Sequence, residues 1–569
     1  ALTVVPAIAT RLLDRPRSRR SRVERAMDRT QGIVDRIGQG FQGLLEAALR
    51  HRYLTLILAA GFLVGTFRLV PPLIGNELMP PMDTGIVNLE VEAPSHYRPG
   101  RVEAVLGKVE KNIQATPGVE RISSVVGSEP GQISFGSGGA TAQTIQMRVD
   151  LVDRTQREAT IWEIEDRWRR MLEELPGARS YTVSEYGATP VATTKAPLDI
   201  IIKGPDTAEL DRQANRVLKA LEGMPGVVDV TRSWYPDKPG QEVRLDPELA
   251  RLYGTSPEQV GRTLRAAVDG TPAGDLRLEG FLDIPVQVAY REQDLRGAGA
   301  LESVYVETPK GQIPLRALAA VSPEREPPFI TREDLQATID ITAVNRGYTI
   351  GQVAAMAEER LKDLGLPRGY SVEVGGTIAD LEENQRRMRQ ALLPGLGMLY
   401  LLLLAQFRSF RHPLTIMAAI PLAAAGAVWG LLLFGKPLCM PAIMGIILLG
   451  GTVVNNSILL LDFVERSRER GMAREEAVKE AMRLRIRPVL MTTVSTVIGL
   501  TPLVLETAVG LERMSPLGVA AAVGLTIGTV WTLVVVPVIY VALEDLGLGL
   551  SRALGRPVRA DPGASAGTV

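Results

Sequence analysis

The chain has 569 residues, and its 64 basic side chains balance its 64 acidic ones. It contains no acidic or basic tract of the length that indicates nucleic-acid binding, so no nucleic-acid partner is expected. Its single cysteine, Cys439, excludes an intrachain disulfide framework and is interpreted as a small apolar residue at the start of a helix.

The first residues resemble the end of a membrane helix. Val4-Val5-Pro6-Ala7-Ile8 repeats the pattern of Val535-Val536-Pro537-Val538-Ile539, and charged residues follow in both places. Self-similarity of this kind indicates an internal repeat. We therefore expect residues 1–13 to be the end of a preceding transmembrane helix, with a similar half of the protein upstream.

An Arg-rich segment and six apolar runs come next. We interpret residues 14–52 as a cytoplasmic linker with an amphipathic helix. A bilayer core needs about 20 apolar residues in helical form, and residues 53–75 supply the first span. The other five runs lie within 389–546, at 391–407, 413–434, 438–464, 488–505 and 516–543. This layout predicts a polytopic α-helical membrane bundle of about six transmembrane helices plus the end of a preceding one, followed by a disordered cytoplasmic tail at 547–569.

Arginine and lysine mark one side of the membrane. If each run spans once, the linker, the turn with Arg408 and Arg411, the connection at 466–487 and the tail share one side. Positive charge concentrates in cytoplasmic segments. The large domain between the first and second runs is therefore predicted to face outward.

Four segments of this outward domain share one order: strand, helix, Pro-Gly break, strand. Apolar and polar residues alternate in the strands, and Pro-Gly pairs such as Pro117-Gly118 end the helices. Pairs of such βαβ units build ferredoxin-like sandwiches, so the domain is predicted to be α+β. One pair covers residues 76–190, and the other covers 191–240 and 324–388 around an insertion at 241–323.

No catalytic constellation stands out in the outward domain. It has no phosphate-binding glycine loop and no Ser/His/Asp set, and the whole chain has 3 histidines. We expect neither an enzyme nor a metal site. The Gly-rich stretch 131–139 is either a plain loop or part of a substrate path, to which Gly136, Gly138 and Gly139 would contribute.

Polar side chains interrupt two of the apolar runs. Asn455 and Asn456 lie in the middle of one run, and Thr492 and Thr493 lie about one turn inside the next. An amide without a hydrogen bond in hydrocarbon costs several kcal/mol, so these side chains must face protein or water. These side chains either form hydrogen bonds that hold the helices together or belong to a polar relay.

Several motifs strongly resemble the resistance–nodulation–division (RND) efflux permeases. The resemblance covers about residues 1–546. The motifs that carry it are Asn455-Asn456-Ser457-Ile458-Leu459, Asp462-Phe463, Arg470-Gly471-Met472, Glu475-Glu476-Ala477, Arg483-Leu484-Arg485-Ile486-Arg487-Pro488-Val489-Leu490-Met491-Thr492-Thr493, Glu77-Leu78-Met79-Pro80-Pro81-Met82-Asp83-Thr84-Gly85 and Gly311-Gln312-Ile313-Pro314-Leu315.

The resemblance implies an architecture and an assembly. Such permeases have two similar halves, each with one helix, a large periplasmic loop and five more helices. This chain resembles the C-terminal half, with two porter subdomains and a docking subdomain at 241–323. The family implies the bacterial inner membrane, a homotrimer, a missing N-terminal half, a periplasmic adaptor and an outer-membrane channel. Proton motive force drives efflux without another cofactor.

The resemblance also implies site residues. The acidic proton carriers of the family lie in the missing half, and Asn455, Asn456, Thr492 and Arg485 match the positions of their polar partners. Drug-exporting relatives often have lysine at the position of Asn455, which could form an ion pair where asparagine can only hydrogen-bond. Asp462 is expected to be an interfacial residue.

The substrate is expected to be an amphiphilic organic compound. Heavy-metal exporters of the superfamily use methionines in the periplasmic cleft, whereas Met147 stands alone on its strand. The absence of a soft-ligand cluster argues against copper or silver. Two alternatives stay open: a heavy-metal exporter, and a protein-export accessory subunit with the same layout. A membrane-anchored sensor or enzyme would need a constellation that the sequence lacks.

Overall fold

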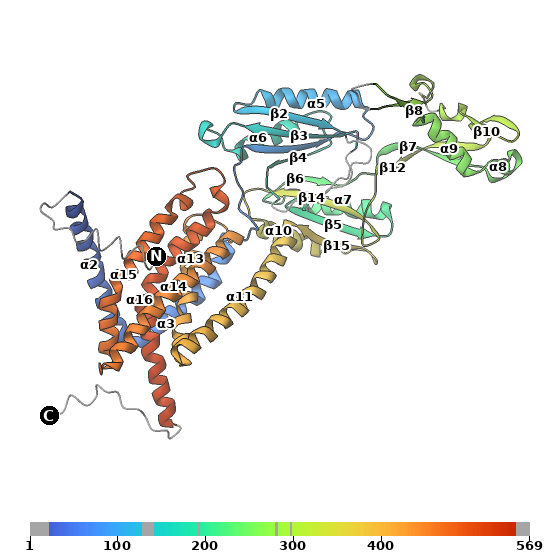
Figure 1. The fold of residues 1–569 in the computed structure, drawn as a ribbon. Coiled ribbons are helices and arrows are strands. Elements are labelled where there is room, and N and C mark those ends of the chain that lie inside the picture. Colours follow the sequence, from blue (N-terminus) through green and yellow to red (C-terminus); the bar gives the residue numbers. More distant parts are fainter. Residues whose placement is uncertain are drawn as a thin grey trace, which may run out of the picture.

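A computed structural model describes residues 22–127, 141–189, 194–278, 283–295, 297 and 299–553, without the side chains of 22–35, 292 and 547–553. The predicted helix end at 1–13, the end of the tail and Gly136, Gly138 and Gly139 lie outside the described residues. A helical bundle forms one end of the molecule, and α/β lobes extend from it (Figure 1). This arrangement confirms the predicted combination of membrane bundle and α+β domain.

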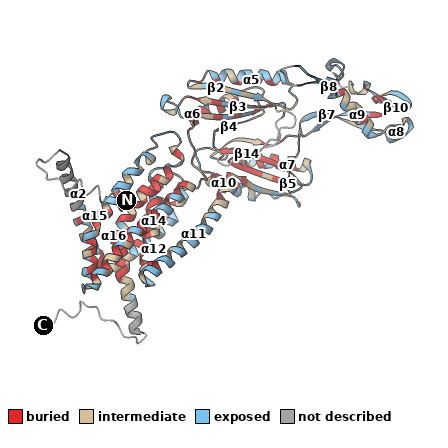
Figure 2. Ribbon diagram, in the orientation of Figure 1, coloured by how far each residue is buried: buried red, intermediate tan, exposed pale blue. Residues whose placement is uncertain are grey.

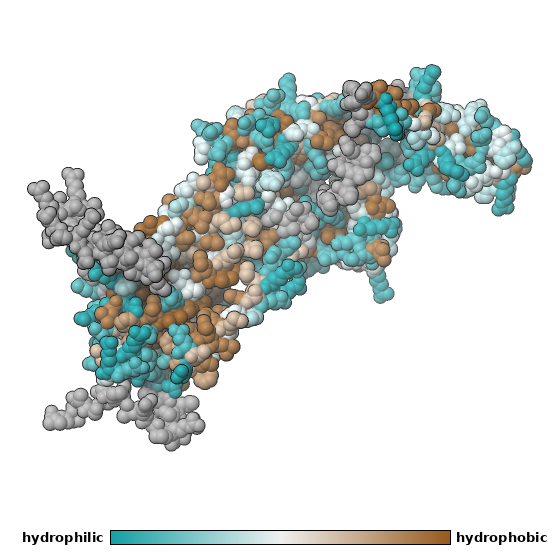
Figure 3. All heavy atoms as spheres, viewed as in Figure 1, coloured by the Kyte–Doolittle hydropathy of each residue, from teal (hydrophilic) through white to brown (hydrophobic). Residues whose placement is uncertain are grey.

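Six helical segments of the described chain could cross a membrane by length and composition. Figure 3 shows an apolar belt over them, between more polar ends. The segments are α3 (Arg52–Leu69) with α4 (Pro71–Ile74), α11 (Thr377–Phe407), α12 (Arg411–Met417) with α13 (Ala419–Leu433), α14 (Met440–Glu469), α15 (Arg474–Val504) and α16 (Ser515–Ala553).

Three helix boundaries differ from the predicted ones. α11 begins at Thr377, directly after the last strand of the domain, and α15 begins at Arg474 and contains Pro488 in its interior. α16 continues to Ala553, into the segment predicted as a disordered tail. Apolar runs mark only the part of a helix that suits lipid, whereas backbone hydrogen bonds continue through polar turns.

Helices α13 and α16 form the centre of the bundle. The apolar window of α16 is 72% buried, against 6% for α11, and Figure 2 shows the same contrast between bundle core and periphery. Glycines allow the close packing: a Cβ at Gly426 would lie 2.7 Å from Ile527 Cβ, and one at Gly528 would lie 2.8 Å from Ala423 Cβ. Small residues at helix contacts are typical of membrane bundles.

Helix α2 (Arg22–Arg50) lies beside α15 (Figure 1). Leu45 and Leu49 are buried in one apolar cluster with Met482 and Ile486 of α15. The apolar face of α2 is therefore covered by the bundle along its C-terminal half.

The first α/β subdomain is an antiparallel sheet with strand order β2-β3-β1-β4. Its apolar face packs against two helices, one of which begins at a capping box made by Thr160 and Glu163. The elements are β1 (Ile86–Glu92), α5 (Pro99–Gln114), β2 (Val119–Val126), β3 (Thr144–Leu151), α6 (Ile161–Glu173) and β4 (Ser180–Glu185). This is the ferredoxin-like order that the paired units predict.

The second subdomain repeats this topology. Strand β14 pairs with both β5 and β6, β15 pairs with β5, and the short β13 extends the edge. The elements are β5 (Leu198–Gly204), α7 (Thr207–Leu221), β6 (Val227–Arg232), β13 (Thr331–Glu333), β14 (Gln336–Asn345), α10 (Ile350–Lys362) and β15 (Ser371–Gly376).

A third lobe is inserted between β6 and β13. An antiparallel arm of two strands, β7 and β12, leads to it (Figure 1), and Val260, Val306, Leu315 and Leu318 form its small core. The elements are β7 (Lys238–Leu245), α8 (Pro247–Tyr253), α9 (Pro257–Val268), β8 (Thr271–Leu276), β9 (Ile284–Val288), β10 (Tyr305–Thr308), β11 (Gly311–Pro314) and β12 (Ala319–Glu326).

The contacts between the bundle and the α/β subdomains include two joints. At the first, the backbone N–H of Glu77 donates to the carbonyl of Leu438 (3.1 Å). At the second, Arg154 pairs with Glu512 and donates to the carbonyl of Glu506 (2.6 Å). Both partners of Arg154 lie in the segment that connects α15 to α16, so these contacts join that segment to the loop after β3.

Candidate functional site

The two asparagines of α14 point in different directions. Asn456 is 8% exposed and faces the bundle, whereas Asn455 is exposed. Adjacent residues of an α-helix project about 100° apart, which separates the two side chains. Only Asn455 is available to a group outside this chain.

The threonines of α15 divide in the same way. Thr493 is buried, and its hydroxyl lies 2.9 Å from that of Thr529 on α16. Thr492 is exposed, and its hydroxyl donates to the carbonyl of Val489 (2.9 Å). Thr493 therefore packs helices together, while Thr492 faces outward.

Arg485 lies two turns before Thr492 on the same face of α15. Its guanidinium stacks on the ring of Phe463 at 3.9 Å from the centroid. Its Nε is buried without a hydrogen-bond partner in the described part of the chain. The contact with Phe463 joins α15 to α14 at this level.

We define the outward stripe as Asn455 of α14 with Thr492, Ser495 and Thr496 of α15, all of which are exposed within predicted spans. The stripe contains amide and hydroxyl groups but no carboxylate. Hydrocarbon cannot hydrogen-bond to these groups, so polar membrane surfaces of this kind face protein or water. The stripe therefore requires a polar partner.

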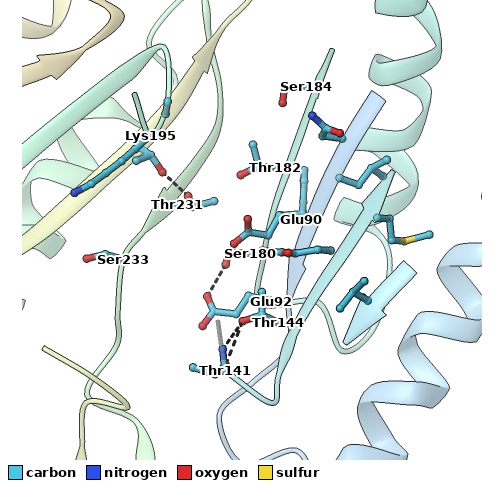
Figure 4. Close-up of a pocket in the computed structure, with 18 of the residues that line it drawn as sticks. Glu90, Glu92, Thr141, Thr144, Ser180, Thr182, Ser184, Lys195, Thr231 and Ser233 are labelled. Atoms are coloured by element: carbon cyan, nitrogen blue, oxygen red, sulfur yellow. Dashed lines mark hydrogen bonds between the residues drawn. The ribbon is translucent and has the colours of Figure 1, made fainter. Parts of the chain in front are cut away.

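A second candidate site is a cavity of about 530 Å³ between the two α/β subdomains. The alternation of β1 builds one wall: Val87, Leu89 and Val91 are buried in the core, while Asn88 and Glu90 are exposed on the other face. Hydroxyl groups of β4 extend this polar wall (Figure 4). They belong to Ser180, Thr182 and Ser184.

The charged groups of the cavity differ in their environment. Glu92 pairs with Arg179, and Lys195 pairs with Asp340. Burial raises the pKa of Glu90 above its usual value, and the neighbouring Glu92 raises it further. Glu90 is open to the cavity and is nevertheless surrounded by many protein atoms.

The cavity offers few soft ligands. Met147 borders it, but its side chain is 3% exposed and packs in the apolar core of the first sheet. In the described ranges, no group of three or more His, Cys, Asp or Glu side chains could hold a metal ion.

Sequence reasoning overlooked Glu90 and the bond between Thr493 and Thr529. The alternation of polar residues along β1 was the available signal for Glu90, but every strand with one solvent-exposed face has the same alternation. The cavity also depends on how two sheets from distant segments pack. The pairing of Thr493 with Thr529 depends on helix packing that the sequence does not reveal.

Comparison with known proteins gives one family and one fold. A model of the AcrB/AcrD/AcrF family matches residues 1–544. Two solved structures of a heavy metal efflux pump, crystal forms II and I, are similar, with TM-scores of 0.80 and 0.78. Each is 22% identical, and the match covers 90% of this chain and 52% of the pump. The chain thus spans about half the length of the solved structures that it matches.

Proposed function

The chain belongs to the AcrB/AcrD/AcrF family of RND permeases, and from this premise we propose that it acts as the C-terminal half of a proton-driven efflux transporter. The observation that carries the proposal is the outward stripe. Its amide and hydroxyl groups stand open in membrane-spanning segments and match a partner surface that contains ionisable groups.

In this proposal the partner surface is the N-terminal half, whose carboxylates carry the protons. Asn455 and Thr492 hydrogen-bond those carboxylates, Asn456 supports α14 from inside the bundle, and Arg485 supplies positive charge nearby. Asparagine cannot form an ion pair, so protonation changes hydrogen bonds rather than breaking a salt bridge. Proton motive force is the only energy source, and no cofactor takes part.

The proposed assembly is a homotrimer in the bacterial inner membrane, with the α/β subdomains in the periplasm. A periplasmic adaptor and an outer-membrane channel complete the path. The protein is a secondary transporter rather than an enzyme.

The proposed cargo is an amphiphilic organic compound bound in the cavity between the subdomains. The similarity to heavy metal efflux pumps makes metal export the second candidate. The chemistry of the described cavity favours the organic cargo, because Met147 packs in the core and no metal-binding cluster accompanies it.

Substitution of the stripe tests the proton-relay role. In the full-length permease that contains this half, Asn455→Leu with Thr492→Ala removes the hydrogen-bonding groups and leaves the apolar packing. We expect ethidium accumulation in cells to rise at least about tenfold toward the level without the permease, since the relay step depends on both groups.

The matched control is Asn112→Leu with Thr501→Ala. Asn112 is exposed on α5, and Thr501 lies on the opposite face of α15 with the same hydroxyl-to-carbonyl bond as Thr492. Both variants must reach the membrane in equal amounts by immunoblot. Wild-type ethidium efflux in the stripe variant would contradict the proposal.

A further inference from the structure

We propose that the cavity selects cargo bearing an ammonium or guanidinium group and that Glu90 is the selecting residue. This inference names a substrate class for the proposed transport function and rests on it, but its test concerns binding alone.

Every other charged side chain that lines the cavity has an oppositely charged partner. Figure 4 shows Lys195 extending away from Glu90. The pairs are Glu92 with Arg179, Lys195 with Asp340, Arg232 with Asp211 (2.6 Å) and Arg148 with Asp150 (3.2 Å). Glu90 forms no ion pair or hydrogen bond with any described side chain, so it leaves one uncompensated negative charge on the wall.

Two segments outside the described residues adjoin lining residues in the sequence, and neither carries a basic side chain. Residues 128–140 and 190–193 adjoin the lining residues Thr141 and Thr194, and neither segment contains lysine, arginine or histidine. No basic side chain of the described residues or of these two segments pairs with Glu90, so a cation bound in the cavity would neutralise it.

The neighbours of Glu90 suit an organic cation. In the sheet register, Glu90 lies opposite Gln146 on β3 and opposite Thr182 on β4. Directly opposite side chains on one face are about 5 Å apart at Cβ. One carboxylate, one amide oxygen and one hydroxyl oxygen match the three N–H donors of an ammonium group.

The remainder of the cavity suits a molecule larger than an ion. Its volume of about 530 Å³ falls within the range of small-molecule sites. Val125, which is 56% exposed, and Phe329 line it as well. A cation attached to an apolar body would contact both kinds of wall.

Two fluorescent probes that differ by one ammonium group test this selectivity. Dansylcadaverine carries a primary ammonium, and dansyl-pentylamide has the same fluorophore and tail without it. Their affinities for the purified full chain in lipid nanodiscs are measured by fluorescence anisotropy. We expect dansylcadaverine to bind at least about tenfold more tightly, since hydrogen bonds to charged groups are the stronger class.

Glu90→Gln should abolish this preference without affecting dansyl-pentylamide. The control Glu103→Gln, at an exposed position of α5 on the other side of the sheet, should retain it. The proposal that Glu90 selects the ammonium group is contradicted if Glu90→Gln retains the preference. It is also contradicted if the wild type binds both probes equally.

A second variant keeps the test decisive if Glu90→Gln lowers the melting temperature. Gln146→Glu adds a carboxylate opposite Glu90 and should tighten dansylcadaverine binding several-fold, whereas unchanged binding would contradict the proposal. If the wild type prefers dansylcadaverine but the stripe variant still exports ethidium normally, only the transport proposal is contradicted. The reverse pattern would contradict the Glu90 proposal alone.

Discussion

At the scale of single residues, two carboxylates of the segment 77–85 bind the starts of two helices. Glu77 accepts hydrogen bonds from the backbone N–H of Ile350 (2.8 Å) and from Asn345 (3.2 Å). Asp83 pairs with Arg157 and accepts the N–H of Ile161 (3.1 Å). Each carboxylate binds the first turn of a helix, α10 or α6, where it complements the unpaired backbone donors.

Glu77 should make the stability of the protein depend on pH. Burial raises its pKa from 4.5 to about 7. Because this pKa is higher in the folded than in the unfolded chain, the folded protein retains the proton longer. The free energy of unfolding therefore decreases as pH rises from about 4.5 to about 7. Glutamine can accept the same hydrogen bonds without charge.

We expect Glu77→Gln to melt at a higher temperature than the wild type at about pH 8, with a gain of up to about 3 kcal/mol. At about pH 3 the two should differ little, because Glu77 is then largely protonated in both folded and unfolded chains. Tryptophan fluorescence during heating measures both, with Glu103→Gln as the control. If Glu77→Gln melted at the same temperature as the wild type at both pH values, Glu77 would not titrate in this range.

The sequence identified polar residues within apolar runs but not the directions in which they point. Asn455 and Asn456 are chemically identical, and only the packing of α14 buries one and exposes the other. Glu90 resembles any polar residue on a half-exposed strand. Its significance arises from a second sheet, formed by residues far along the chain, that closes the cavity above it.

At the scale of elements, the bundle depends on contacts that only glycine permits. A Cβ at Gly445 of α14 would lie 2.6 Å from the carbonyl oxygen of Leu517 on α16. Because this oxygen belongs to the backbone, it cannot easily move away to relieve the clash. Gly451, on the same helix, has nothing within 4 Å of the equivalent point. Comparing alanine substitutions at the two positions therefore distinguishes the cost of the close contact from the general effect of replacing glycine in a helix.

Gly445→Ala should therefore destabilise the bundle by about 1–3 kcal/mol, the usual cost of overpacking. Gly451→Ala should be neutral or stabilising by up to about 1 kcal/mol, since alanine favours helix. Size-exclusion profiles and melting temperatures of the detergent-purified variants measure the difference. Equal behaviour of the two variants would contradict the close contact between α14 and α16.

Hydropathy predicted the number of spans but not the length of every helix. The first half of α15 is rich in arginine, yet Ala477, Val478, Ala481 and Met482 are buried against the bundle. Their spacing is that of one helical face, which a count of apolar residues does not detect. The apolar run that begins at Pro488 covers only the second half of α15, so Pro488 lies in the interior of the helix.

At the scale of the whole molecule, the joint at Arg154 connects the proposed relay to the cavity. Glu512 is 6% exposed, and its partner Arg154 follows β3, the strand that carries Gln146 and Arg148 in the cavity wall. The linkage runs from α15 through the segment 505–513 to β3. Spatial continuity alone does not demonstrate coupling, so a double-mutant cycle is needed.

Arg154→Ala and Glu512→Ala should each slow ethidium efflux by the full-length permease about tenfold, and the double variant should be no slower than either single one. Residues that act as one pair show this non-additivity. The control is Arg121→Ala, an exposed position on β2. Independent, multiplying effects would show that the pair does not transmit the movement.

The architecture as a whole followed from sequence because its signals are long and repeated. Two copies of a strand–helix–strand pair predicted both sheets, and six apolar runs predicted six spans. The packing of the subdomains on the bundle was not predictable. It relies on a few contacts, such as that of Glu77 with Leu438, which join segments hundreds of residues apart.

The direct junction of β15 with α11 has a mechanical consequence. The helix runs for 31 residues from the sheet into the bundle, with Pro394 in its interior, so it forms an arm about 46 Å long that can also bend at the proline. A tilt of about 5° would carry one end of such an arm about 4 Å relative to the other. Because α11 is only 6% buried over its apolar window, few described residues of this chain restrain that tilt, and a small rotation of the helix would displace the strand attached to it.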